Sequence, residues 1–449
     1  MIKKISLLLC CVLASFSCAL ASIDDSTSSD STVANSSDTT TASTDGSSSS
    51  GEVTAPEPTT PAGEPAPALK DWSVLIYLSP NGWGNFAIKQ IDEAVSGICD
   101  ETTNVLVCCR LTNKYASLWQ LTHDGMVQCD PIKEVESDAD RLTRLMQMLI
   151  EQYPAQKYAL ILNGDSTGLV DFVYDGEQKK WVESEFTGQT RGVLLNDKLG
   201  TQLTTTELLD VMNMVSQIRG GKLDLLVADT SFMGGLELAA AFGDSVAIYL
   251  AAQSHQYLAG FSYETLFGTL AQTGVSAARL GAAVATASAT QFNDGGSYPK
   301  FKSFSVTDCA AAQSLLNDFI SFINDLNLTL ALDDRLAAEV YATSLSLKRE
   351  LRNNYYVDFV AWLTQVRAIL VSYAAVFHTD LAERIASIDG LIAGMSTVVL
   401  TNAAVDGVAM CGLSLCCPKK IGSFPLDLWN PWHQFIQTSI DTASCEECV

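Results

Sequence analysis

Short apolar runs alternate with segments of helical spacing between residues 72 and 251. Runs that are apolar at consecutive positions predict β-strands at 72–78, 104–109, 158–162, 223–228 and 246–251. Apolar residues that recur every three or four positions predict helices at 85–99, 138–153, 206–219 and 234–242. Strands that are apolar on both faces are typical of a largely parallel sheet covered by helices on both sides. The sequence therefore predicts an α/β fold.

The last third of the chain has mainly helical spacing. It predicts helices at 310–326, 334–351, 358–377 and 380–393, followed by strand-like runs at 397–401 and 407–416. Two shorter strands, 117–121 and 126–129, read as a hairpin. We therefore expect an α/β domain over residues 71–300, a helical C-terminal extension over 301–440 that contributes late strands, and a short cysteine-containing tail over 441–449.

The first 21 residues have the composition of a secretory signal peptide. Two lysines precede the apolar stretch 5–16, and Ala19 and Ala21 offer a cleavage site between small residues. The apolar stretch is too short for a good membrane span, so we expect no transmembrane segment in the mature chain. Cys18 leaves an alternative open, a lipoprotein acylated at that cysteine. The sequence predicts export, to the periplasm, the cell surface or the medium.

Residues 22–70 contain Ser, Thr and Asp, then Pro, Ala and Glu, with almost no large apolar side chain. Such a composition cannot bury enough surface to offset its ordering entropy and predicts a disordered linker. The formal net charge of the chain is −24. The signal peptide contributes +2 and residues 22–69 contribute −8, which leaves −18 for residues 70–449. Nucleic acid and anionic membranes are therefore poor partners, and a basic peptide or protein is a better one.

Thirteen cysteines occur in the chain, three of them in the signal peptide. An exported chain permits disulfides among the other ten, but spacing does not give their pairing. Cys108, Cys109 and Cys411 lie in strand-like runs, where buried free thiols are at least as good an interpretation. Cys445 and Cys448 favour a local or intermolecular disulfide.

Two polar loops follow buried strands and are the candidates for chemistry. One loop, 163–168, follows the strand that ends at Leu162, and the other contains Ser231 after the strand that ends at Ala228. Ligands of a helix-covered parallel sheet bind beyond the carboxyl ends of its strands. We therefore expect these two loops to meet at one edge of the sheet.

The segments around these loops resemble the clostripain-like cysteine peptidases, which have a caspase-like fold. In that family a buried strand leads into Asp-x-Cys-x-Met-Gly, whose cysteine is the nucleophile, and an earlier strand leads into Asn-His-Gly, whose histidine is the base. The resemblance extends over about residues 71–440, through 72–78, 191–193, 203–208, 355–359, 412–415 and 432–436. It implies a caspase-like, largely parallel sheet flanked by helices.

The catalytic positions depart from the family pattern. Ser231 stands where the cysteine belongs, and Asp165 stands where the histidine belongs, or Gly164 if the loop is aligned one residue differently. A serine hydroxyl is a much weaker acid than a thiol and needs a positioned base, for which an ordinary aspartate is poor. The resemblance thus implies a pseudopeptidase that binds peptide or protein partners through the former substrate cleft.

Two other function classes stay open. Ser231 could be the nucleophile of a peptidase or acyl hydrolase with His255 as its base, because His255 alone of the four histidines follows a strand on the same edge. The fold could also serve only as the scaffold of a surface interaction protein, with binding in the linker or the C-terminal region. A credible base beside the Ser231 hydroxyl would favour the enzyme.

Asp229 and nearby acidic residues have further interpretations. The resemblance implies that Asp229 helps to hold a basic side chain, Lys or Arg, of a substrate or partner; alternatively the carboxylate only orders the turn before the next helix. We expect no cofactor from the residues themselves. Calcium is an option that the family suggests, with Asp165, Asp171, Asp175 and Asp229 as oxygen ligands.

Overall fold

A computed structural model of the chain describes residues 69–79, 84–110, 115–130, 132–133, 137–169, 172–175, 180–183, 193–195, 201–254, 256, 260–291, 303–347, 355–404, 410–417 and 430–446. All of them belong to one compact unit, Pro67–Val449. The predicted signal peptide, nearly all of the predicted linker, and Cys448 lie outside the described residues.

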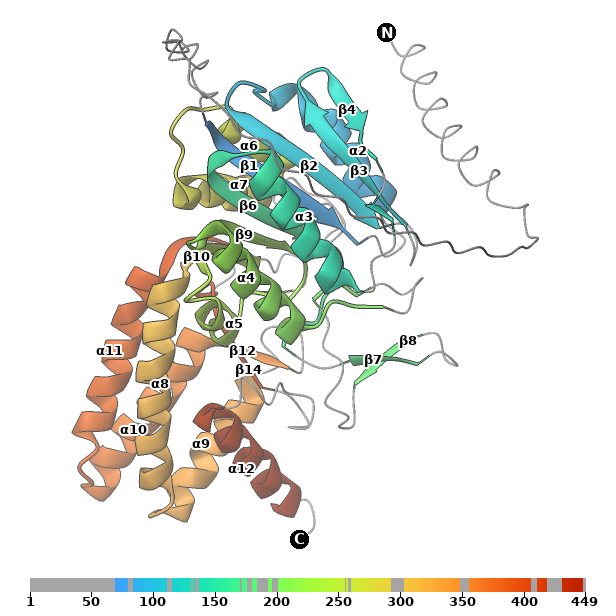
Figure 1. Cartoon of the computed structure of the whole chain (residues 1–449). Coiled ribbons are helices and arrows are strands. Elements are labelled where there is room, and N and C mark those ends of the chain that lie inside the picture. Colours follow the sequence, from blue (N-terminus) through green and yellow to red (C-terminus); the bar gives the residue numbers. More distant parts are fainter. Residues whose placement is uncertain are drawn as a thin grey trace, which may run out of the picture. The chain divides into compact units, whose positions relative to one another are not determined.

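A ten-stranded mixed sheet forms the centre of this unit (Figure 1). Its middle strands are parallel neighbours in the order β10 (Val246–Ala252), β9 (Leu223–Asp229), β6 (Ala155–Asn163), β1 (Lys70–Leu78) and β2 (Thr103–Arg110). Antiparallel strands complete one side, namely β3 (Tyr115–Thr122), β4 (Gly125–Gln128) and β5 (Ile132–Lys133). On the other side β11 (Ser303–Asp308) and β13 (Val399–Ala404) are also antiparallel. The predicted α/β fold is confirmed.

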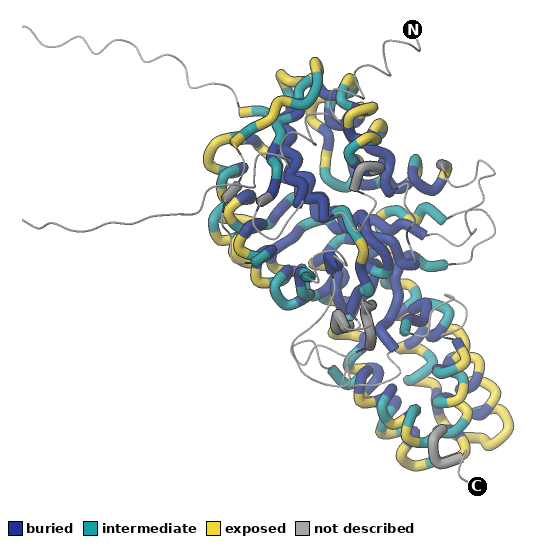
Figure 2. Tube along the Cα trace, turned by 90° about the vertical axis from the view of Figure 1, so that its right-hand side faces the viewer, coloured by how far each residue is buried: buried dark blue, intermediate teal, exposed yellow. Residues whose placement is uncertain are grey.

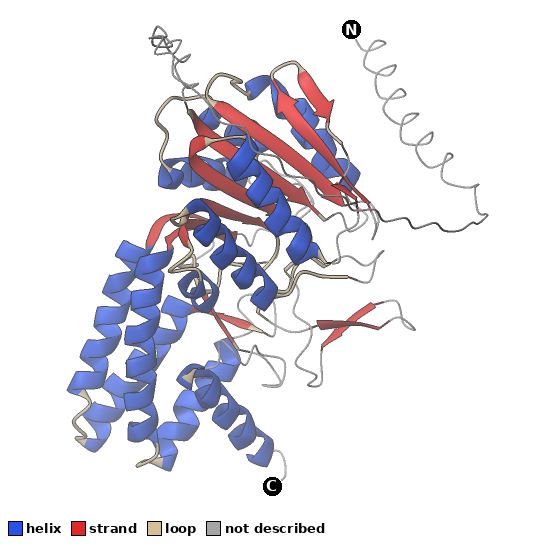
Figure 3. Cartoon of the chain, in the orientation of Figure 1, coloured by secondary structure: helices blue, strands red, loops and turns tan. Residues whose placement is uncertain are grey.

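Helices cover both faces of the sheet, which explains why its strands are apolar at consecutive positions (Figure 3). Along β1, Leu75 and Tyr77 face one core, and Val74 and Ile76 face the other. The first core is shared with α3 (Asp138–Gln152), α4 (Thr205–Arg219) and α5 (Leu236–Ala241). The second is shared with α2 (Gly84–Ala94), its 3₁₀ continuation η1 (Val95–Gly97), α6 (Tyr263–Leu270) and α7 (Ala277–Gln291).

The helix boundaries follow the capping residues. Ser137 is the N-cap of α3, and its side chain accepts a hydrogen bond from the backbone N–H of Asp140. Thr204 and Glu207 form a capping box at the start of α4, and Gly220, with φ of 72°, ends that helix in the left-handed conformation. Helices α6 and α7 and strand β11 were not predicted.

The helical extension consists of α8 (Cys309–Leu330), α9 (Asp334–Ser346), α10 (Phe359–Phe377), α11 (Ala382–Val398) and α12 (Pro431–Glu446). Stacked and edge-on aromatic rings fill its core, and the ring centroids of Trp362 and Trp432 lie 4.9 Å apart. The strand predicted at 397–401 begins only at Val399, because α11 continues through Val398. Two small sheets complete the fold: β12 (Tyr356–Asp358) with β14 (Ser414–Cys416), and β7 (Phe172–Asp175) with β8 (Lys180–Glu183).

Within the described residues, α10 is the one helix that is long and apolar enough for a membrane span. Its buried residues recur at helical spacing, from Phe359 and Trp362 to Tyr373. Figure 2 shows this alternation of buried and exposed positions along the extension. The buried face shows that α10 is a core helix of the bundle. Its last turn also carries two exposed apolar residues, Val376 and Phe377.

Candidate functional site at the carboxyl edge of the sheet

The two predicted loops do meet at one edge of the sheet. Strands β6 and β9 are adjacent and parallel, and Asn163 is paired in register with Asp229, the last residue of each strand. The loop after β6 and the turn at Ser231 after β9 therefore leave the sheet side by side. Ser166 joins them, because its hydroxyl donates to the carbonyl oxygen of Ser231 and lies 2.9 Å from the hydroxyl of Thr230.

Tyr356 of the C-terminal part clamps the first loop onto the second. Its hydroxyl donates to the carbonyl oxygen of Thr167 at 2.6 Å and accepts the backbone N–H of Leu169 at 2.7 Å. Its ring stacks on that of Phe232, with centroids 5.8 Å apart. A residue of the extension is thus part of the edge where the two loops meet.

Backbone conformation in both loops depends on this close packing. Gly168 has φ of +69°, and a Cβ atom there would lie 2.3 Å from the Tyr356 hydroxyl and 2.4 Å from the Phe232 carbonyl oxygen. Only glycine fits such a position. Phe232 itself has φ of +58°, an uncommon value for a bulky residue. Its N–H donates to the Ser254 carbonyl at 3.0 Å, which helps to hold the strained turn.

The Ser231 side chain is 2 % exposed, and Gln256 holds its hydroxyl. The oxygen accepts the backbone N–H of Gln256 at 2.9 Å, and the hydroxyl donates to the Gln256 carbonyl oxygen at 3.3 Å. An amide carbonyl orients a hydroxyl proton but does not take it up near neutral pH, so this contact does not generate an alkoxide.

The Asp229 carboxylate is equally buried and receives four hydrogen bonds. One oxygen accepts from the side-chain amide of Gln256 and from the backbone N–H of Phe261 at 3.0 Å. The other accepts from the side-chain amide of Asn163 at 2.7 Å and from the hydroxyl of Tyr263 at 3.1 Å. The carboxylate therefore joins β6, β9, the segment after β10 and the start of α6.

All four groups that donate hydrogen bonds to Asp229 are neutral, so none of them supplies a positive charge to balance the carboxylate. Burial raises the pKa of Asp229 to about 6, although the four hydrogen bonds act in the opposite direction. Gly260 packs directly against the carboxylate: a Cβ atom at this residue, whose φ is +58°, would lie 2.8 Å from one of its oxygens. The site holds a buried carboxylate that carries a charge at neutral pH without a cation among its four donors.

Asp165, the predicted replacement for the histidine, is exposed at the entrance to the first loop. Its carboxylate accepts the backbone N–H of Ser166 at 3.0 Å, and its carbonyl oxygen accepts the N–H of Leu195 at 2.9 Å. Gly164, the alternative position, is more enclosed, since a Cβ atom there would lie 3.1 Å from both the Ser79 carbonyl oxygen and a methyl group of Leu194.

Some predicted site residues lie outside what the structure describes. His255, the candidate base, and Asp171 are outside the described residues, and of Asp175 only the backbone in β7 is described. Among the described residues, no group of three or more His, Cys, Asp or Glu side chains is arranged as metal ligands. The calcium site and the pairing of Ser231 with His255 stay predictions.

The other described histidines lie on other elements. His123 is in the turn between β3 and β4, and His378 caps the end of α10. His433 is buried on α12, where burial lowers its pKa to about 3. The predicted disulfides also fall partly outside the described residues. Among the cysteines whose side chains are described, Cys99, Cys108, Cys109, Cys129, Cys309 and Cys411 are free thiols, with Cys108 and Cys109 buried and Cys411 partly exposed.

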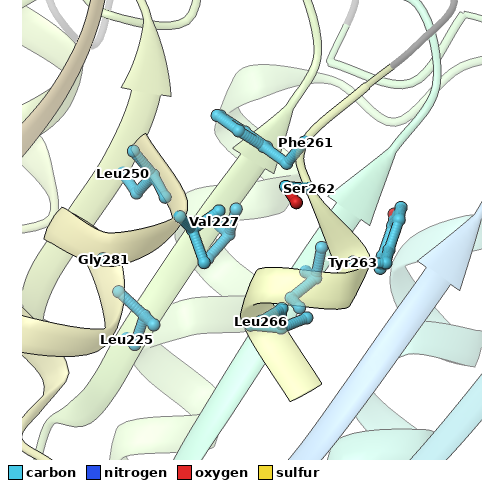
Figure 4. A pocket seen from close by; sticks show the side chains of 10 residues that line it. Leu225, Val227, Leu250, Phe261, Ser262, Tyr263, Leu266 and Gly281 are labelled. Carbon is cyan, nitrogen blue, oxygen red and sulfur yellow. The ribbon is translucent and has the colours of Figure 1, made fainter. Parts of the chain in front are cut away.

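A small cavity lies between the sheet and helices α6 and α7 (Figure 4). Its volume is about 10 Å³, and its walls are mainly apolar, including Leu225, Val227 and Leu250. A cavity of this size is at the limit for one water molecule, and it lacks the polar groups that would hold one. It is therefore a packing defect behind the site and not a ligand pocket.

Three residues of the site were not predicted from sequence: Gln256, Tyr263 and Tyr356. Tyr356 lies in a segment noted only for its family resemblance, and Gln256 and Tyr263 follow the last predicted strand of the α/β domain. A polar residue shortly after a buried strand was the available signal for Gln256. Nothing local distinguishes Tyr263 or Tyr356 from core tyrosines.

Comparison with known protein families matches residues 77–389 to the clostripain family. The chain belongs to the clostripain family. A search of curated proteins gives no match.

Solved structures of clostripain-family proteins share the fold. An inactive zymogen of a C11 protease from Parabacteroides distasonis has a TM-score of 0.54 and 16% sequence identity, covering 82% of this chain and 99% of its own. A secreted C11 cysteine protease from Bacteroides thetaiotaomicron has a TM-score of 0.56 and 14% identity, covering 82% and 100%. The caspase-like architecture expected from the sequence resemblance is thus confirmed.

Proposed function

We propose that this clostripain-family protein is an exported pseudopeptidase, which binds a peptide or protein partner through the former substrate cleft and does not cleave it. The carrying observation is the state of Ser231. The family resemblance implies that this residue replaces the catalytic cysteine, and its hydroxyl is held by the backbone of Gln256. A thiolate forms near neutral pH, whereas a serine hydroxyl needs a base that removes its proton.

Asp165 is unsuited to that role. Its carboxylate already accepts the N–H of Ser166, and a solvent-exposed carboxylate is a poor base for a hydroxyl. Loss of the thiol and of the imidazole together supports a non-catalytic protein more strongly than either change would alone.

Asp229 supports binding of a Lys or Arg side chain. The carboxylate is buried among neutral donors, and one of these, the Gln256 side-chain amide, comes from a loop segment and not from the sheet. A cationic group that displaced this amide would replace a neutral donor with a charged one and form an ion pair with the carboxylate. The Gln256 amide thus acts as an internal substitute for the partner's basic side chain.

Catalysis is tested with fluorogenic peptides that carry Arg or Lys before the scissile bond. We expect no turnover by the wild type and no labelling of Ser231 by a fluorophosphonate probe. Turnover that disappears in Ser231→Ala would overturn the proposal and favour the hydrolase with His255 as base. Ser231→Cys combined with Gly164→His or with Asp165→His tests the ancestry of the site, because restored cleavage would show which position aligns with the family histidine.

Binding is tested by calorimetry with a Lys-containing peptide and its matched norleucine peptide. We expect the Lys peptide to bind the wild type more tightly, and Gln256→Ala to bind it more tightly still, because the internal competitor is gone. Asp229→Asn is expected to remove the difference between the two peptides. Equal binding of both peptides by the wild type and by Gln256→Ala would show that Asp229 does not recognise a basic side chain.

The pH dependence supplies a further check. Asp229 has a pKa of about 6, so it is charged above that pH and neutral below it. The affinity for the Lys peptide is therefore expected to fall as the pH is lowered from 7.5 to 5, while the affinity for the norleucine peptide stays constant. An unchanged ratio of the two affinities would contradict a role for the Asp229 charge.

A further inference from the structure

A groove opens at one end of the helical extension, on different elements from Ser231 and Asp229. The end of α8, the start of α9, the end of α10 and the start of α11 meet there. The groove has a volume of about 430 Å³, which is within the range of ligand pockets in proteins. Its lining includes the exposed Leu332 and three side chains that are buried in the core of the extension, Leu336, Tyr373 and Leu381.

Exposed apolar side chains occur on the helix ends that line this groove. Nine large apolar side chains are exposed in the described part of the chain, and five of them lie between residues 328 and 377. Leu332 is 89 % exposed, and Leu328, one turn earlier at the end of α8, is 67 % exposed. Val376 is 64 % exposed beside Phe377, whose ring lies 4.4 Å from that of Tyr373. Exposed apolar residues that gather in this way favour an interaction site, whereas the other four are spread over separate elements.

The charged residues at the groove are predominantly acidic. Asp333, Asp380 and Glu383 line it together with Arg384, and Arg335 lies beside it, 4.9 Å from the centroid of the Phe377 ring. Arg384 lies 3.6 Å from Glu383 and 3.7 Å from Asp325, so acidic neighbours already accompany it. The groove therefore presents apolar surface together with an excess of negative charge.

This charge selects among possible occupants. A second copy of the chain would bring an equally acidic groove or surface against this one, since the folded part has a strong net negative charge. An anionic membrane would be repelled for the same reason. A partner with apolar side chains beside Lys or Arg matches both the surface and its charge.

We propose that this groove binds a segment of a partner protein that inserts apolar side chains and places Lys or Arg residues against Asp333, Asp380 and Glu383. The apolar contacts supply most of the affinity, and the acidic residues supply orientation and selectivity against acidic segments. This second binding surface is independent of the proposed function at the sheet edge. It uses the extension, which in this chain carries both the groove and the clamp residue Tyr356.

The test uses the mature protein and three synthetic peptides of equal length with amphipathic helical patterns, measured by fluorescence anisotropy. The peptides are built from Leu and Lys, from Leu and Glu, and from Ser and Lys. We expect the Leu–Lys peptide to bind at least ten-fold more tightly than the other two. Leu332→Ser combined with Phe377→Ser is expected to lower its affinity at least ten-fold, and Asp380→Asn is expected to lower it less and to reduce its salt dependence.

Met214→Ser is the matched control, because Met214 is also exposed but lies on α4. Its affinity for the Leu–Lys peptide is expected to equal that of the wild type, and thermal melts of all variants establish that they fold. Equal affinity of the Leu332→Ser/Phe377→Ser variant and the control would overturn the proposal. So would tighter binding to phosphatidylcholine or phosphatidylglycerol vesicles than to the peptide, or a concentration-dependent dimer abolished by the same double variant.

Discussion

The sheet edge around Ser231 and the groove at the end of the helical extension differ in how fully contacts within the chain cover their side chains. At the sheet edge, Asp229 accepts four hydrogen bonds from its own chain, and Ser231 is held by Gln256. At the groove, Leu332 and Val376 are exposed with no apolar neighbour to cover them fully. The polar groups at the sheet edge are thus paired within the chain, whereas apolar side chains at the groove are exposed to solvent.

A second buried carboxyl group, that of Glu237, differs from Asp229 in the hydrogen-bond donors that it receives. Glu237 on α5 accepts the backbone N–H of Cys416 at 2.8 Å with one oxygen, while its other oxygen has no partner among the described residues. Burial raises the pKa of Glu237 to about 7, higher than that of Asp229. Four donors keep Asp229 charged at neutral pH, whereas the backbone N–H groups that lower the pKa of Glu237 offset less of the effect of its burial.

The largest expected effect comes from filling the contact between the two loops. Gly168→Ala is expected to destabilise the protein by roughly 2–5 kcal/mol, because it adds the left-handed backbone penalty to a clash with Tyr356 and Phe232. Gly220→Ala is the control, since Gly220 has φ of +72° but nothing within 4 Å of its Cβ position. It is expected to cost only about 1–2 kcal/mol in urea unfolding. An equal loss of unfolding free energy in both variants would show that the two loops rearrange to accept the added Cβ atom.

The next effect depends on pH and concerns Glu237. A folded-state pKa raised from 4.5 to about 7 gives a stability contribution that is complete below pH 4.5 and is lost as the pH rises through 7. Glu237→Gln keeps a carbonyl acceptor for Cys416 and removes the charge. It is therefore expected to stabilise the protein by roughly 1–3 kcal/mol at pH 8 and hardly at all at pH 4.5.

Glu264→Gln, at an exposed position of α6, serves as the control in the same urea titrations. Its effect is expected to be small at both pH values. A stabilisation by Glu237→Gln that is equal at pH 4.5 and pH 8 would mean that the charge of Glu237 is not the cause.

Sequence pattern was sufficient for the central strands and for the meeting of the two loops. Strands such as 223–228 are apolar on both faces, and only a sheet covered on both sides buries them. The loops at Asn163 and Ser231 then meet, because adjacent parallel strands end at the same edge. Helices α6 and α7 were not predicted because neither has a clear apolar stripe. Helix α6 is short and largely buried, and α7 is rich in alanine.

The partners of the site could not be predicted, because they are brought in by tertiary contacts. Tyr356 lies 187 residues from Leu169, whose N–H its hydroxyl accepts. Tyr263 reaches Asp229 only because α6 packs on the second face of the sheet. The groove could not be predicted for the same reason, because the sequence around Leu332 and Val376 does not show whether another helix covers these side chains.

The clamp from Tyr356 gives an effect of intermediate size. Tyr356→Phe keeps the ring stacked on Phe232 but leaves the Thr167 carbonyl and the Leu169 N–H without their partner. The expected cost is about 1–3 kcal/mol in urea unfolding, since two buried backbone groups lose a hydrogen bond. Tyr373→Phe at the groove removes a part-buried hydrogen bond to Asp333, whose carboxylate keeps two backbone N–H donors, and is expected to cost less than Tyr356→Phe. The reverse order would contradict the contrast between the two regions.

The smallest expected effect on stability lies at the groove itself. Leu332→Ala truncates a side chain that is 89 % exposed and is expected to change the free energy of unfolding by less than about 0.5 kcal/mol. Leu336→Ala, four residues later on α9 and 1 % exposed, is expected to cost about 2–5 kcal/mol because it leaves a cavity. Urea unfolding of both variants measures the difference. A large cost at Leu332 would mean that the chain itself covers this side chain in solution, and the groove would then not be available to a partner.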